Sequence, residues 1–181
     1  MRFGSLLVAG FAALAAAIPA NKVVENIRMV TSQSQQLLTP AKNLVLLDGP
    51  LLVTGQGNFP PIIAGFQQIV TTATAAINQM NPPEKYSGQG ADEIFDAFRT
   101  FVMVHQELLN VLIGKAGLFN TIPFIGQPVA AVLRAVESVV DTIAFSLIDS
   151  IESRAADLTK EADSLSSTIG TAIDTYSGLS L

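Results

Sequence analysis

The sequence predicts an all-α protein, an antiparallel bundle of four or five helices that forms one domain after residue 20. Three observations lead to this prediction. Apolar residues recur at alternating steps of about three and four along nearly the whole chain, which is the spacing of one helix face. No segment alternates with a period of two, as a half-buried strand would. Glycine and proline residues divide the pattern into segments of helical length.

The first 20 residues have the organisation of a secretory signal peptide. Arg2 supplies a positive charge, and a short apolar segment runs from Leu6 to Leu14. Small residues follow, so we expect cleavage after Ala17 or after Ala20, and the sequence favours neither. The expected product is an exported single domain, residues 21–181, which is long enough to bury one core.

The first helix of the bundle carries an apolar face from Val23 to Leu38. Thr39-Pro40 is typical of a helix N-terminus, so we expect a kink or a restart there, before a stop at Asp48-Gly49-Pro50. The second helix is expected from Ile62 to Met80, because the prolines that follow Asn81 lack the donor a helix needs.

The third helix is expected from Ala91 to Leu112, with Gly114 and Gly117 marking its end. The fourth begins after Pro123, and the fifth shows the cleanest spacing, from Ile151 to Tyr176. No glycine or proline separates the last two helices, so one continuous helix is an alternative. A turn within 149–153 is favoured, because it lets both apolar faces close on one core.

Composition excludes several classes of protein. The formal net charge of −5 becomes −6 without Arg2, which argues against binding to nucleic acid or to anionic lipid by charge alone. The chain has no cysteine, so disulfide-stapled secreted scaffolds are excluded and stability must come from the core. The part after residue 20 has no apolar run long enough to span a bilayer.

No catalytic constellation is recognisable in the sequence. His105 is the only histidine and lies within the apolar stripe of the third helix, so a buried, hydrogen-bonded core residue is the simpler interpretation. No serine lies in a Gly-x-Ser-x-Gly elbow, and the acidic residues are scattered along the expected helices. We therefore expect a non-enzymatic protein without a metal or a cofactor.

The chain carries more apolar residues than a small bundle needs to bury. The connection 116–133 has no charged residue although connections are normally polar, and the stretch 49–83 has none either. Phe145 lies opposite the main apolar stripe of its helix. Ala155 and Ala162 leave a gap on the inward face of the fifth helix, which either the phenylalanine-rich third helix fills or a lipid tunnel occupies. Together these features favour a protein that handles apolar material.

The chain resembles the fungal hydrophobic surface binding protein A family, which includes cell wall galactomannoproteins. The resemblance rests on apolar spacings at Val23, Ile27 and Val30, at Ile62, Phe66 and Ile69, in Leu112–Ala116, in Leu133–Asp141, and at Ala172, Ile173 and Tyr176. It implies an exported all-α protein that adsorbs to hydrophobic surfaces, in some members recruiting a secreted hydrolase. In the galactomannoprotein branch it implies a helical domain that encloses a long-chain fatty acid.

Two mechanisms and one alternative class follow. In the first, a cavity binds a lipid, and its expected apolar lining is Phe66, Phe98, Phe101, Val102, Leu109, Leu118, Phe119, Ile122, Phe124, Ala155 and Ala162. Arg99, His105 and Lys115 are its expected head-group contacts. In the second, the amphipathic helices adsorb to an interface, with first contact through Phe119, Phe124 and Phe145. The alternative is a structural or antigenic cell wall mannoprotein with no specific ligand.

Overall fold

The computed structural model describes residues 18–81, 83–122 and 124–179, so most of the predicted signal peptide lies outside the described residues. Within these ranges the chain forms helices and no strand. In chain order the elements are α1 (Ala20–Lys42), α2 (Asp48–Val53), α3 (Phe59–Gln79), α4 (Gly88–Ala116), the 3-10 turn η1 (Gly117–Phe119), α5 (Gly126–Ser150), the 3-10 turn η2 (Glu152–Arg154) and α6 (Ala155–Ser177).

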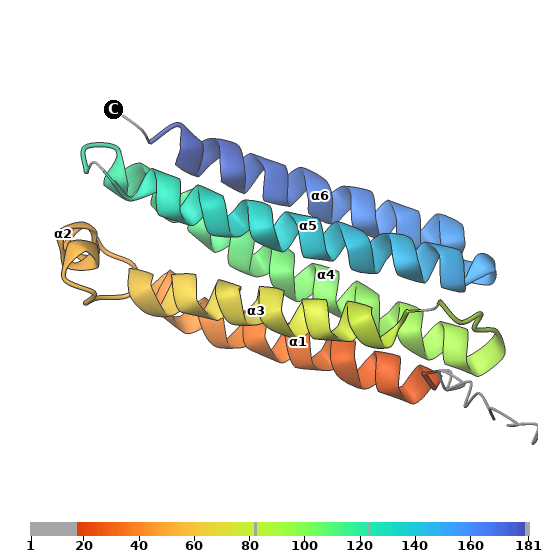
Figure 1. Ribbon diagram of the computed structural model, residues 1–181. Helices are drawn as coiled ribbons and strands as arrows, with labels where there is room; N and C mark the ends of the chain where they lie inside the picture. Colours follow the sequence, from red (N-terminus) through yellow and green to blue (C-terminus); the bar gives the residue numbers. More distant parts are fainter. Residues whose placement is uncertain (1–17, 82, 123, 180–181) are drawn as a thin grey trace, which may run out of the picture.

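The long helices form a closed ring (Figure 1). Helix α1 packs between α3 and α4, α6 packs between α4 and α5, and α3 packs on α5. Successive long helices run in opposite directions, with α1, α4 and α6 pointing one way and α3 and α5 the other. Each helix has one apolar face, and the ring turns all of these faces toward a common axis. The predicted all-α bundle is confirmed.

Two boundaries differ from the sequence prediction. Helix α1 continues through Pro40 to Lys42 without a restart, because a proline in the last turn removes only a single hydrogen bond and leaves the rest of the helix intact. The predicted stop at 48–50 is instead the start of the short helix α2. The predicted turn between the last two long helices is confirmed: Ile151 leaves the helical conformation, with φ −128° and ψ 78°, and its side chain is fully buried.

Asp48 holds the corner that joins α1, α2 and α3. Its carboxylate accepts hydrogen bonds from the backbone N–H of Val45 and of Asn58, both at 2.8 Å, and from the Asn58 side-chain amide at 3.1 Å. Burial by itself raises the pKa of Asp48, but these hydrogen bonds outweigh it, and the net pKa is lowered. The conformation of Gly57, with φ 82°, brings the chain so close that a Cβ there would lie 2.6 Å from the carboxylate.

None of the helices in the described part of the chain is long and apolar enough to cross a membrane.

Candidate functional site: an apolar cavity inside the ring

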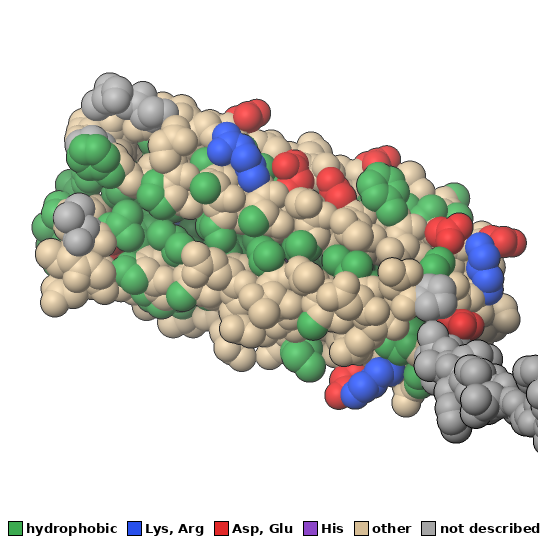
Figure 2. Space-filling model, in the orientation of Figure 1, with side chains coloured by type: hydrophobic (Ala, Val, Ile, Leu, Met, Phe, Trp, Pro, Cys, Tyr) green, Lys and Arg blue, Asp and Glu red, His purple; other side chains and the backbone are tan. Residues whose placement is uncertain are grey.

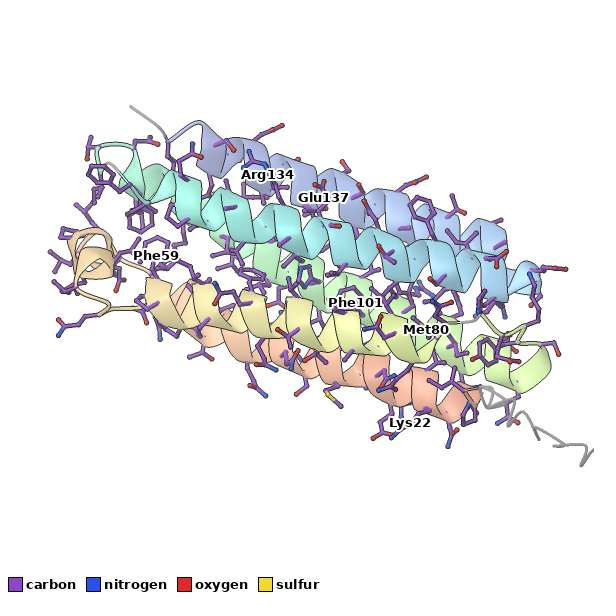
Figure 3. The ribbon with its side chains drawn as sticks, viewed as in Figure 1. Lys22, Phe59, Met80, Phe101, Arg134 and Glu137 are labelled. Atoms are coloured by element: carbon purple, nitrogen blue, oxygen red, sulfur yellow. The ribbon has the colours of Figure 1, made fainter. Side chains whose placement is uncertain are left out.

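An apolar cavity of about 20 Å³ lies inside the bundle between α1, α3, α4 and α5. It is lined by Val23, Asn26, Ile27, Val30, Ala73, Ala76, Met80, Phe98, Phe101, Val140 and Ile143. Figure 3 shows Met80 and Phe101 in the half of the bundle away from Phe59. Asn26 is the only lining residue with a polar side chain, and its amide donates to Gln79 Oε1 at 3.0 Å.

Small side chains on α3 shape the wall of this cavity. Ala73 and Ala76 face Val140 and Ile143 of α5 across it, so the seam between α3 and α5 passes over the cavity. Hydrophobic side chains gather along this seam in the space-filling view (Figure 2). As it stands the cavity has room for about one water molecule. A larger guest has to displace side chains.

A groove on the outside of the bundle lies next to the cavity. It has a volume of about 380 Å³ and is lined by Ile77, Met80, Asn81, Pro83, Phe145, Ser146 and Asp149. Met80 lines both spaces and therefore lies where they adjoin. Methionine is unbranched and adapts readily to different packing, so its movement would connect the groove with the cavity. Phe145 is exposed, as predicted, and lies at this groove.

His105 is a polar residue within the apolar core, one helical turn beyond Phe101. The residue is fully buried, and its Nδ1 lies 2.9 Å from Ser34 Oγ. Its ring lies between two phenylalanine rings, with centroids 5.2 Å from Phe101 and 6.1 Å from Phe66. Among the described residues no group hydrogen-bonds to its Nε2, although that atom is buried. Burial lowers the pKa of His105 to about 4.

The lowered pKa of His105 predicts a specific pH dependence of stability. Between about pH 4 and 6.5 the unfolded chain binds a proton at His105 that the folded protein does not, so acidification favours unfolding. We expect the free energy of unfolding to decrease by as much as about 3 kcal/mol as the pH falls through this range, and to be insensitive to His105 above it.

Urea unfolding at several pH values, compared with His105→Leu, measures this effect. The variant keeps Asp141, whose pKa burial raises, so its contribution cancels in the difference between the two proteins. Equal pH profiles for the parent and the variant would show that His105 takes up its proton in the folded state as easily as in the unfolded chain.

Only two of the predicted lining residues line this cavity: Phe98 and Phe101. Phe66, Val102 and Leu109 are buried in the core beside it without lining it. The predicted lining residues of the segment after α4 lie elsewhere in the structure. Phe119 packs against Phe59 at the other end of the bundle, with ring centroids 4.7 Å apart, and Leu118, Ile122 and Phe124 belong to the same connection, away from the cavity.

The two predicted alanines of α6 do not line this cavity either. Ala155 and Ala162 are partly buried, but no residue of α6 lines the cavity. The small residues that do line it are Ala73 and Ala76 of α3, which the sequence prediction did not include. The sequence could have indicated them, because they lie on the same inward stripe as Ile69. Small residues between large apolar ones leave room in a core.

Two of the three predicted head-group cations lie elsewhere. Arg99 is on the outer face of α4 and pairs with Glu161 at 3.6 Å. Lys115 donates to the backbone oxygen of Leu44 at 3.0 Å, near the opposite end of the bundle. Neither residue lines the cavity, whereas His105 is adjacent to it through Phe101. No group of three or more His, Asp or Glu residues in the described ranges could hold a metal ion.

A second apolar feature, here called the end patch, lies on α2 and its neighbouring connections. Its exposed side chains are Val45, Leu46, Leu47, Leu51, Leu118 and Phe124. Helix α2 lies against the α4–α5 connection, since a side chain at Gly49 would meet Ile122 and Ile125. Figure 2 shows green side chains gathered at this end. Phe119, predicted to make surface contact, is fully buried and does not belong to the patch.

Phe124 is the most exposed member of the end patch, with 77% of its surface accessible. Its backbone has φ 78°, a conformation that is unfavourable for a bulky residue. Because the Phe124 side chain is exposed, it gains little packing energy that could offset this backbone strain. The feature therefore points to a role at the surface.

Comparisons with known proteins identify the fold. No protein-family model and no curated protein sequence matches the chain. Among solved structures, Afmp4p in complex with palmitic acid is similar with a TM-score of 0.76 at 14% identity, covering 87% of this chain and 99% of the other. Ligand binding domain 2 of Penicillium marneffei MP1 protein, in complex with arachidonic acids, has a TM-score of 0.72 at 14% identity, over 89% and 94% of the two chains. Domain 1 of the same protein, also with arachidonic acids, gives 0.67 at 16%, over 86% and 95%.

Proposed function

We propose that this protein is an exported, non-enzymatic member of the fungal family named above and binds a long-chain fatty acid inside its helical ring. The observation that carries the proposal is the apolar cavity between α1, α3, α4 and α5. It occurs in a fold shared with domains that were solved with palmitic or arachidonic acid. The interior residues have almost no polar atoms to offer a substrate, which favours binding over catalysis.

The energetics favour a long chain as the guest. Burying one methylene contributes about 0.8 kcal/mol, so a sixteen-carbon chain gains roughly 12 kcal/mol before the costs of association. The cavity, with a volume of about 20 Å³, is too small for such a chain, so the ligand must displace side chains. Met80 is suited to this, because it lies between the outer groove and the cavity. We infer that the chain enters from the groove beside Phe145.

Filling the cavity from its wall should abolish binding. Ala76→Phe places a ring where the cavity lies, and we expect it to weaken the binding of palmitic acid at least tenfold. The measurement is a titration in which palmitic acid displaces a fluorescent fatty acid. Because a ring in a packed core costs about 1–3 kcal/mol, thermal unfolding must confirm that the variant is folded. If it is not, Ala76→Leu tests the same point with a smaller side chain.

Ala162→Phe is the matched control, since Ala162 is an alanine of the bundle that does not line the cavity. We expect it to bind palmitic acid like the parent. Normal binding by a folded Ala76→Phe, or equal losses in both variants, would place the ligand elsewhere or refute the cavity.

Adsorption to hydrophobic surfaces is a second candidate, favoured by the end patch. Six large apolar side chains are exposed at one end of the bundle, and an apolar support would remove them from water. The double variant Leu47→Ser with Phe124→Asn should lower retention on hydrophobic beads at least tenfold, because two large apolar contacts are lost. Asparagine is chosen because it tolerates positive φ.

Met103→Ser is the control for this experiment, since Met103 is 63% exposed on α4 and lies outside the end patch. We expect this variant to be retained like the parent. If all three proteins are retained equally, the end patch has no part in adsorption.

A further inference from the structure

The atom that prompts the inference is His105 Nε2, which is buried without a hydrogen-bond partner among the described residues. Buried polar atoms are nearly always hydrogen-bonded, so an exception in a core calls for an explanation. Its surroundings give it none, because the rings of Phe66 and Phe101 flank the imidazole. Phe101 also lines the cavity, so His105 packs against a residue of the cavity wall.

The hydrogen bonds of Ser34 determine which proton His105 carries. Ser34 Oγ lies 3.2 Å from the backbone oxygen of Val30 and 2.9 Å from His105 Nδ1. A hydroxyl has one proton, so both contacts are hydrogen bonds only when Ser34 donates to Val30 and Nδ1–H donates to Ser34. In that tautomer Nε2 carries a lone pair. It is therefore an acceptor that lacks a donor.

The charges around the entrance disfavour an anionic head group there. At this end Lys85 Nζ lies 3.5 Å from a carboxylate oxygen of Asp149 and of Glu152. The formal net charge of these three residues is −1. Asp149 is itself a lining residue of the outer groove. A carboxylate at the mouth would approach this net negative cluster, whereas a carboxyl group inside the core would be protonated, because an ion is costly to bury.

We propose that the ligand binds with its polar end inward and donates a hydrogen bond from a hydroxyl or a protonated carboxyl group to His105 Nε2. This inference rests on the proposed function and adds the orientation and the head-group chemistry. The chain then occupies the cavity from Phe101 outward, and its tail end reaches Met80 and the outer groove. Ser34 is a positioning residue, because its bond to Nδ1 keeps the Nε2 lone pair available.

The choice of ligand follows from this arrangement. A long-chain alcohol or acid has the O–H donor that Nε2 requires, whereas a methyl ester of the same chain has only acceptors. We expect 1-dodecanol to bind roughly three- to tenfold more tightly than methyl dodecanoate, the effect of one neutral hydrogen bond. In His105→Leu this preference should disappear, while both compounds still bind through their chains.

Nitrogen NMR tests the contact directly, because the chain has a single histidine. In protein labelled with ¹⁵N-histidine, Nε2 should resonate as an unprotonated nitrogen and should shift on addition of 1-dodecanol or dodecanoic acid. Methyl dodecanoate and dodecane should leave it nearly unchanged. Displacement of a fluorescent fatty acid is followed in parallel on the same samples.

The outcomes separate the two proposals. If none of the compounds displaces the fluorescent fatty acid, the proposed function fails and the inference fails with it. If they bind but 1-dodecanol moves Nε2 no more than methyl dodecanoate does, the fatty-acid function stands and the inward orientation is overturned. A protonated Nε2 in the ligand-free protein would also overturn it, because that nitrogen could not accept.

Discussion

Asp48→Ala is expected to lower the free energy of unfolding by about 2 kcal/mol. The change removes the acceptor of three N–H groups, from the Val45 backbone, the Asn58 backbone and the Asn58 amide. These donors are only partly buried, and the Asn58 amide keeps its contact with the Asn43 backbone oxygen at 3.3 Å, so the loss is about that of one hydrogen bond to a charged group. Urea unfolding at pH 7 measures the loss.

Asp48→Asn is the matched control for this prediction. It keeps one acceptor oxygen but places an NH₂ group against the remaining donors, so we expect a smaller loss than for alanine. The pKa of Asp48 is lowered in the folded protein, so its contribution is present above the ordinary value of 3.8 and is lost as the pH falls below it. The difference in stability between the parent and Asp48→Ala should therefore become smaller as the pH falls below 3.8. A loss for Asp48→Ala below about 1 kcal/mol at pH 7 would show that the corner forms without the carboxylate.

The position of α2 also connects Asp48 with the end patch. Leu47 and Leu51 flank it on either side and are exposed. Because the carboxylate ties the loop at Val45 to the loop at Asn58, it holds α2 in the orientation that keeps these leucines outward. A folded Asp48→Ala variant should accordingly be retained less well on hydrophobic beads than the parent.

Gly126→Ala is expected to destabilise the protein by about 3 kcal/mol, the upper end of the cost of overpacking. Gly126 is the first residue of α5, and a Cβ there would overlap the backbone carbonyl of Tyr176 near the end of α6. It would also lie 3.1 Å from Leu179 Cβ. A backbone atom cannot move aside as a side chain can, and Tyr176 is anchored by its hydroxyl, which donates to the Leu112 carbonyl at 2.9 Å.

The same substitution at Gly170 should have the opposite sign. Gly170 lies within α6, and a Cβ there would meet no atom within 4 Å. Alanine is a better helix former than glycine, so Gly170→Ala should stabilise the protein by up to about 1 kcal/mol. Thermal unfolding of the two variants compares them directly. A Gly126→Ala protein as stable as the parent would mean that α5 and α6 separate at this end without cost.

The cavity illustrates how far the sequence leads toward a site. The inward stripes of the helices were readable, and Phe98 and Phe101 are both on them and at the cavity. The alanines that the sequence analysis chose, Ala155 and Ala162, do not line the cavity, whereas Ala73 and Ala76 line it together with Val140 and Ile143. Periodicity shows on which side of its helix a residue lies. Only the order of the helices in the ring shows which residues lie opposite it.

The same reason explains the head-group candidates. Arg99 and Lys115 were chosen for charge, and the structure gives them other partners, Glu161 and the Leu44 carbonyl. His105 was interpreted as a core residue with its hydrogen bonds made. It is in the core, but one of its two nitrogens has no partner there, which depends on the residues that α1 and α3 bring next to it.

By itself the sequence determined the helical class, the approximate helix limits and the excess of apolar residues, because these follow from local spacing and composition. The tertiary structure decided where that excess lies. Part of it encloses a cavity between four helices, part forms the end patch, and Phe119, which looked exposed, fills the core. The difference arises because burial depends on neighbours distant in the chain, and here α1 lies beside α4, and α3 beside α5.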